Sequence, residues 1–152
     1  MNVEEIRAAD NGHGETELLA VLVRRGGGYE AGLHYVTDPD WPLQLALQRR
    51  LQGEAIGPFK YNPVTRRQEV SPTATVIVVR TGQILVEFYD SYNQSATIRL
   101  LGPGDVLMTV RGGYRFEMSE ESEFVEVKHG PYAGPLKEKT SFSPWDGGPL
   151  GG

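Results

Sequence analysis

The sequence contains no cysteine and only three histidines among its 152 residues. The absence of cysteine excludes a disulfide framework, a thiolate zinc site, an iron–sulfur cluster and a cysteine nucleophile. The longest basic cluster is a dipeptide and the formal net charge is −5, which argues against a nucleic-acid partner. No apolar run approaches the length of a membrane span, and the acidic start of the chain lacks the order of a secretory signal. The sequence therefore predicts a soluble, cytoplasmic protein without nucleic-acid or membrane partners.

The composition favours one β-rich domain. Hydrophobic residues make up 39% of the chain, which is enough for one packed core. The 19 glycines and 10 prolines suit many short strands and tight turns better than a helical bundle. We expect a flexible N-terminal arm over residues 1–14, in which a short helix over 3–9 is an option. A β-domain over 15–142 follows, and then a Gly/Pro-rich tail over 143–152, whose start Phe142 and Trp145 pin to the body.

Short apolar or alternating runs, separated by turn residues, follow one another through the domain. Leu43, Leu45 and Leu47 alternate with polar or small residues, which favours a strand over a helix there. Strands at such regular intervals predict an all-β sandwich or small barrel. The expected strands cover residues 18–24, 32–37, 43–51, 75–80, 84–89, 96–101, 106–110, 114–118 and 124–128.

Two stretches carry a resemblance to a known family. Residues 75–90 read as a strand, a turn at Gly82 and a second strand, and residues 100–113 contain the turn Gly-Pro-Gly-Asp followed by a strand. With residues 53–142 as a whole, they resemble the cupins, small double-stranded β-helix barrels of the jelly-roll type. The resemblance implies that the earlier strands form an additional sheet. It also extends to a cupin group that accompanies sugar and polysaccharide enzymes.

The resemblance also implies where a cupin metal would be held. Its His-x-His pair would fall at Phe59 and Tyr61, its carboxylate at Thr75 and its last histidine at Tyr114 or Arg115. None of these side chains offers an imidazole or a carboxylate to iron, manganese or zinc. We therefore expect a pocket without metal or cofactor, which disfavours a metal-dependent dioxygenase.

The three histidines are too scattered to rebuild a metal site. His13 lies between glycines in the expected arm, and His34 lies inside an expected strand. His129 ends the last expected strand, where it reaches either the barrel mouth or a surface turn.

The substituted positions predict an aromatic pocket. If they still face inward, Phe59, Tyr61 and Tyr114 give flat walls and hydroxyls suited to a sugar or an aromatic ring. The alternative is that they fill the space that the metal and its ligands left. Lys60 and Arg66 nearby suit an anionic ligand, unless they belong to a solvated edge.

Glu126 and Lys128 alternate with Val125 and Val127, so one pair faces the core. If the valines pack between sheets, the charged pair points into the cleft and can relay a proton. If not, it is an ordinary surface ion pair. The resemblance retains both charges, together with the run that ends at Tyr132.

Two functions follow from these expectations. The first is a metal-independent isomerase or epimerase acting on a small polar or anionic molecule such as a sugar, a nucleotide sugar or an organic acid. The second is a non-catalytic binding or accessory protein. The predicted acid–base groups are Tyr61, Tyr114, Glu126 and Lys128, and the predicted ligand-binding residues are Phe59, Lys60, Arg66, Thr75, His129 and Tyr132. By analogy with small cupins, we also expect a homodimer formed through the outer sheet.

Overall fold

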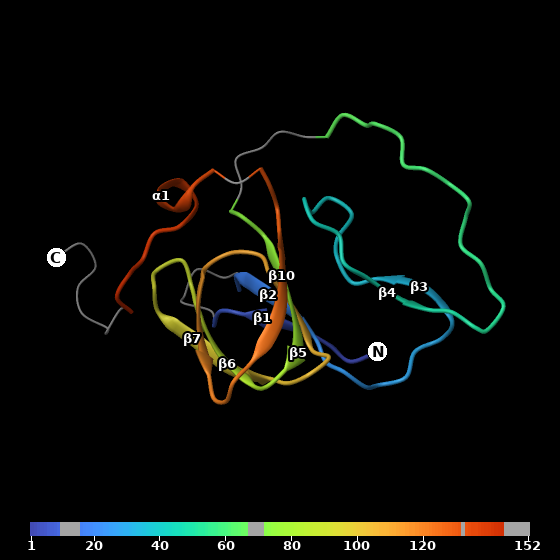
Figure 1. Ribbon diagram of the computed structural model, residues 1–152. Coiled ribbons are helices and arrows are strands. Elements are labelled where there is room, and N and C mark those ends of the chain that lie inside the picture. The colour runs from blue at the N-terminus through green and yellow to red at the C-terminus, as the bar shows by residue number, and fades with distance from the viewer. Residues whose placement is uncertain (10–15, 67–71, 132, 145–152) are drawn as a thin grey trace.

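The computed structural model describes residues 1–9, 16–66, 72–131 and 133–144 (Figure 1). Strands dominate these residues, and a single turn of helix near the end is the exception. In chain order the elements are β1 (Val3–Arg7), β2 (Leu18–Val23), β3 (Gly32–Tyr35), β4 (Ala46–Arg49), β5 (Thr75–Thr81), β6 (Ile84–Tyr89), β7 (Ser95–Leu101), β8 (Val106–Thr109), β9 (Gly113–Met118), β10 (Glu123–Lys128) and α1 (Pro135–Glu138).

Hydrogen bonds join these strands into three antiparallel sheets. The largest has five strands in the order β1-β2-β8-β5-β10, and a second has three in the order β7-β6-β9. The hairpin β3-β4 forms the third. The prediction of an all-β fold is confirmed. Among the described strands the sheets stay open and do not close into a barrel.

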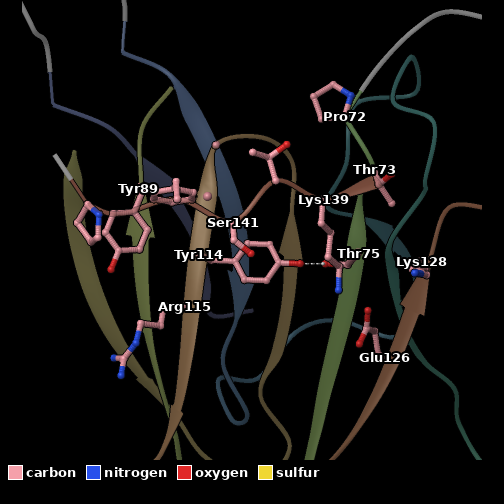
Figure 2. A pocket seen from close by; sticks show the side chains of 15 residues that line it. Pro72, Thr73, Thr75, Tyr89, Tyr114, Arg115, Glu126, Lys128, Lys139 and Ser141 are labelled. Carbon is pink, nitrogen blue, oxygen red and sulfur yellow. Dashed lines mark hydrogen bonds between the residues drawn. The ribbon is translucent and has the colours of Figure 1, made fainter. Parts of the chain in front are cut away.

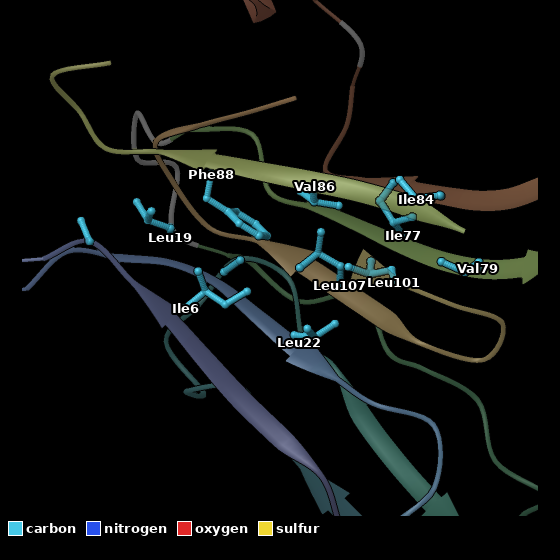
Figure 3. Close-up of a cluster of buried hydrophobic side chains, with 12 residues drawn as sticks. Ile6, Leu19, Leu22, Ile77, Val79, Ile84, Val86, Phe88, Leu101 and Leu107 are labelled. Carbon is cyan, nitrogen blue, oxygen red and sulfur yellow. The ribbon is translucent and has the colours of Figure 1, made fainter. Parts of the chain in front are cut away.

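The core lies between the five-stranded and three-stranded sheets. Alternation along β6 turns Ile84, Val86 and Phe88 inward, where each is at most 1% exposed. Ile77 and Leu107 meet them from the opposite sheet, as Figure 3 shows. Burying these side chains removes them from water, which is the main force that holds the two sheets together.

The outer face of the five-stranded sheet has its own cover. Ala74, Val76 and Met108 form a second buried cluster there. The segment between β3 and β4 packs against this cluster through Trp41, Leu43 and Leu45. This explains why β5 reads as a continuous apolar run, since both of its faces are covered. The outer face of the sheet is therefore covered by this chain itself where the hairpin packs on it.

The structure corrects three local expectations. The optional helix over residues 3–9 is wrong, because these residues begin with β1, which pairs with β2 and buries Ile6. The strand expected over 43–51 is limited to β4, and that expected over 32–37 ends at Tyr35. The other expected strands agree with the structure to within one residue at each end. Residues 10–14 of the expected arm, residue 15 of the expected domain and residues 145–152 of the expected tail lie outside the described residues.

Candidate functional site

A cavity of about 530 Å³ lies where β5 and β9 begin and where β6 and β10 end. The antiparallel pairing brings these four strand termini to the same end of the two sheets. Residues 139–144, which follow α1, complete the wall (Figure 2). The volume is within the range of pockets that hold small molecules.

Three hydroxyl groups lie in contact at the base of the cavity. The hydroxyls of Thr75 and Thr109 are hydrogen-bonded at 2.6 Å, and both residues are buried. The Tyr114 hydroxyl lies 3.5 Å from that of Thr75 (Figure 2). The Tyr114 ring stacks on Phe116 with 5.0 Å between ring centroids, which fixes the direction of its hydroxyl. The result is a positioned group of donors and acceptors that a polar ligand can meet.

Two charged side chains of β10 line the same cavity. Lys128 is paired in register with Thr75, and Glu126 lies two residues earlier on the same face of the strand. Val125 and Val127 point to the opposite face and are 43% and 48% exposed. The charged pair therefore borders the cleft, but the valines do not pack between the sheets, as the corresponding expectation had assumed.

A second group of side chains lies on the other side of β9, as Figure 2 shows for Tyr89 and Arg115. The pKa of Glu87 is lowered, because its carboxylate accepts hydrogen bonds from Tyr89 and Ser95 and lies near Arg115. Burial raises the pKa of Tyr89, and its hydrogen bond to Glu87 adds to this effect. The ion pair with Glu117, at 2.8 Å, raises the pKa of Arg115. Tyr89 is therefore held as a neutral phenol that donates to a carboxylate.

The segment after α1 is anchored over a pair of glycines. The Phe142 ring meets the Tyr89 ring edge-on, with 5.2 Å between centroids. It also lies directly over Gly113, where an added Cβ would come within 2.7 Å of the ring. Gly112 has φ +74°, and a Cβ there would lie 2.3 Å from the Tyr89 carbonyl oxygen. The expected anchoring by Phe142 is confirmed, whereas Trp145 lies outside the described residues.

The structure brings together four of the predicted site residues, namely Thr75, Tyr114, Glu126 and Lys128. His129 does not line this cavity; it is exposed at the end of β10. Tyr132 lies outside the described residues.

The other four predicted residues lie elsewhere, in the exposed segment between β4 and β5. They are Phe59, Lys60, Tyr61 and Arg66. The expectation that Phe59 and Tyr61 face the cavity is wrong, since they are 63% and 90% exposed. The expectation assumed a strand that leads into the barrel, but the prolines at 58 and 63 interrupt any such strand.

Several lining residues were not predicted as site residues. Lys139, Ser141 and Phe142 come from a stretch without strand alternation, and Tyr89 and Arg115 lie on the far side of β9. The signal that was available is the Gly112-Gly113 pair, because adjacent glycines often mark a close approach of another segment.

The donor groups at the expected metal positions do not fit a transition metal. Thr75 and Tyr114 offer only hydroxyls, and among the described residues Glu126 is the one carboxylate that lines this cavity. Within the described residues, no three His, Asp or Glu side chains are grouped so that they could hold a metal ion. The metal-free pocket stays a prediction, which elemental analysis of the purified protein tests.

The chain matches no protein-family model, no curated protein and no solved structure. In the part of the chain that the structure describes, no helix has the length and apolar character needed to span a lipid bilayer. The function is therefore argued from the geometry of the cavity.

Proposed function

We propose that this protein binds a small anionic or polar molecule, such as a sugar phosphate, a nucleotide sugar or an organic acid, in the cavity beside Tyr114. We also propose that the fold is a metal-free cupin double-stranded β-helix. Two features support the fold. From β5 to β10 the chain passes between the two larger sheets at every connection except β6–β7, and the cavity lies at one end of those sheets.

The observation that carries the binding proposal is the charge of the cavity wall. Among the lining residues that the structure describes, Lys128, Lys139 and Arg115 supply three cationic groups and Glu126 supplies one carboxylate. Arg115 is paired with Glu117, and the ammonium groups of Lys128 and Lys139 add positive charge to the same wall, which attracts an anion. The Tyr114 and Thr75 hydroxyls would then orient the ligand by hydrogen bonds.

The shift in melting temperature with added ligand tests this proposal. The probes are uridine diphosphate glucose, glucose 6-phosphate and citrate, with uncharged glucose for comparison. A ligand at 100 times its Kd stabilises the folded state by about 2.7 kcal/mol, which raises the melting temperature by several degrees. We expect at least one anionic probe to do so, and glucose to do so less.

Substitutions in the cavity wall test whether the shift in melting temperature comes from binding in this cavity. Lys128→Met and Tyr114→Phe should each remove most of the shift, whereas Lys137→Met, outside the cavity wall, should keep it. A shift that survives both cavity variants, or no shift with any probe, would count against the proposal.

A second candidate function is acid–base catalysis on the same ligand. What favours it is that the Tyr114 hydroxyl, the Glu126 carboxylate and the Lys128 ammonium border one cavity. A carboxylate and a phenol of the protein that both contact one substrate can remove a proton from it and return a proton to it, as in an isomerase or epimerase. The test is exchange of ligand C–H hydrogens with deuterated water, followed by NMR. Catalysis predicts exchange that Tyr114→Phe and Glu126→Gln abolish and Thr73→Val leaves in place, whereas binding without exchange indicates the accessory protein.

A further inference from the structure

The edge of the five-stranded sheet at β10 is open among the described strands. β10 is the last strand of the order β1-β2-β8-β5-β10 and pairs only with β5. Its outer face carries Val125 and Val127, both more than 40% exposed. An edge strand that shows apolar side chains and unpaired backbone groups can accept another strand.

The segment from Arg49 to Arg66 exposes several large apolar side chains. Every residue in it is exposed, and Figure 1 shows it leaving β4 in a wide excursion before it returns toward β5. Apart from the β3-β4 pairing and a hydrogen bond that the Arg49 side chain donates to the Tyr29 carbonyl oxygen, the hydrogen bonds that the structure gives it are local. Five large apolar side chains are more than half exposed in it, namely Leu51, Ile56, Phe59, Tyr61 and Val64.

The centre of this segment already has the features of a strand. Residues 59–62 lie between Pro58 and Pro63 and alternate aromatic with polar side chains. The Phe59 and Tyr61 rings touch edge-on, with 5.4 Å between centroids. Contact between residues two apart places both rings on the same face of the chain, as in a strand.

The two regions carry opposite charge. Residues 49–66 hold four cationic side chains and one carboxylate, whereas residues 115–128, from β9 to β10, hold five carboxylates and two cationic side chains. Complementary charge of this kind draws such surfaces together and fixes their orientation.

We propose that residues 59–62 of a second copy of this chain add as a strand to the free edge of β10. Main-chain hydrogen bonds supply affinity in such strand addition, and alternate side chains supply specificity. Phe59 and Tyr61 of the partner subunit then cover Val125 and Val127. The next residue faces the opposite way, so Lys60 of the partner subunit comes to the face of the sheet that holds Glu126.

This arrangement closes on itself. If each copy gives its segment to the other, both contacts are the same and the assembly ends at a two-fold dimer. It also completes the cavity, because the partner adds a cation beside the carboxylate of β10. The inference does not depend on which ligand the cavity takes. The proposed dimer contact is the edge of β10, whereas the sequence led us to expect a homodimer formed through the outer sheet.

Cysteine cross-linking tests the contact, because the natural sequence has no cysteine to interfere. The double variant Tyr61→Cys/Val127→Cys should form disulfide-linked dimers on mild oxidation, seen on a non-reducing gel. The matched control Tyr61→Cys/Ile98→Cys, with Ile98 48% exposed on the other sheet, should not. A disulfide closed within one chain, or equal cross-linking in the control, overturns the proposal.

Light scattering on the uncross-linked protein gives an independent answer. The natural sequence should have the mass of a dimer, and Phe59→Ser/Tyr61→Ser should raise the dimer Kd about tenfold or more. Leu136→Ser, at a residue that is 95% exposed outside both regions, should leave it unchanged. Circular dichroism confirms that the variants are folded. A monomeric natural protein at high concentration, or a dimer indifferent to the aromatic pair, contradicts the proposal.

Discussion

At the scale of single residues, the buried threonine pair below Tyr114 determines what the cavity base can do. Thr75 is 4% exposed and Thr109 is 3% exposed, and their hydroxyls are hydrogen-bonded to each other. Thr75 also donates its backbone N–H to the Thr109 hydroxyl at 3.3 Å. A hydroxyl that is held in this way presents its remaining hydrogen-bonding capacity in a fixed direction.

Replacing Thr75 with valine tests this role. Thr75→Val keeps the shape but leaves the Thr109 hydroxyl without its side-chain partner, which should lower the free energy of unfolding by about 1–2 kcal/mol. Chemical denaturation measures this loss. Thr73→Val, at a half-buried residue beside the same cavity, is the control and should change the free energy of unfolding by less. Equal losses in both variants would contradict the role given to the pair.

The pair of Glu87 and Tyr89 gives the stability of the protein a dependence on pH. The Glu87 pKa is lowered from 4.5 by hydrogen bonds from Tyr89 and Ser95. A carboxyl whose pKa is lower in the folded state stabilises the fold above its unfolded pKa, and this contribution is lost as the pH falls through the folded pKa.

Glu87→Gln should therefore flatten the acid side of the stability profile. From about pH 5 downward, the free energy of unfolding of the natural protein should fall more steeply than that of the variant. Denaturation at a series of pH values measures both slopes, and Glu120→Gln, at an exposed turn residue, should keep the natural slope. Identical slopes for the natural protein and Glu87→Gln would exclude this account of the carboxyl.

At the scale of elements, the segment after α1 forms part of the cavity wall because one ring anchors it. Phe142 packs on Tyr89 and occupies the space above Gly113. Lys139 and Ser141 precede this anchor and line the cavity, so their position depends on it.

Gly113→Ala should detach this segment while leaving the sheets intact. The new methyl group would lie 2.7 Å from the Phe142 ring, which must move aside at a cost of about 1–3 kcal/mol. Trypsin should then cut at Lys137 and Lys139 faster than in the natural protein. Gly102→Ala, where an added Cβ meets nothing within 4 Å, serves as the control. Unchanged cleavage in Gly113→Ala would show that Phe142 does not hold the segment.

The strands were easier to predict from the sequence than the surfaces that their side chains face. Short apolar or alternating runs located β5 to β10 well, because burial of the apolar side chains fixes the register of each strand. Alternation also placed Glu126 and Lys128 on one face. The resemblance to cupins implied that Phe59 and Tyr61 face the cavity, and this expectation was wrong. Spacing fixes a shared face but not which surface that face meets, and here the tertiary structure leaves both rings in solvent.

The anchoring by Phe142 was predicted, but the contribution of this segment to the cavity wall was not. Its wall residues come from the stretch after α1, where no periodic pattern exists. Only the closeness of Phe142 to Gly113, which are far apart in the sequence, brings them to the cavity.

At the scale of the whole molecule, two packed sheets hold a rigid core and leave a cavity at one end. The core side chains of β5 and β6 lie below Thr75, Thr109 and Tyr114. The segment of the β3-β4 hairpin covers the outer face of the five-stranded sheet. Three cationic side chains and one carboxylate of the described residues line the cavity, although the chain as a whole has a net charge of −5. A local charge opposite to the overall charge marks that end of the sheets as the place for an anion.

The most direct measurement is an NMR titration of backbone amides with the anionic probe that raises the melting temperature most. The account predicts saturable shift changes centred on Thr75, on Gly112 to Tyr114 and on Glu126 to Lys128, and their loss in Tyr114→Phe. Shift changes centred on the β3-β4 hairpin or spread evenly over the surface, or none at millimolar concentrations of any probe, would contradict it.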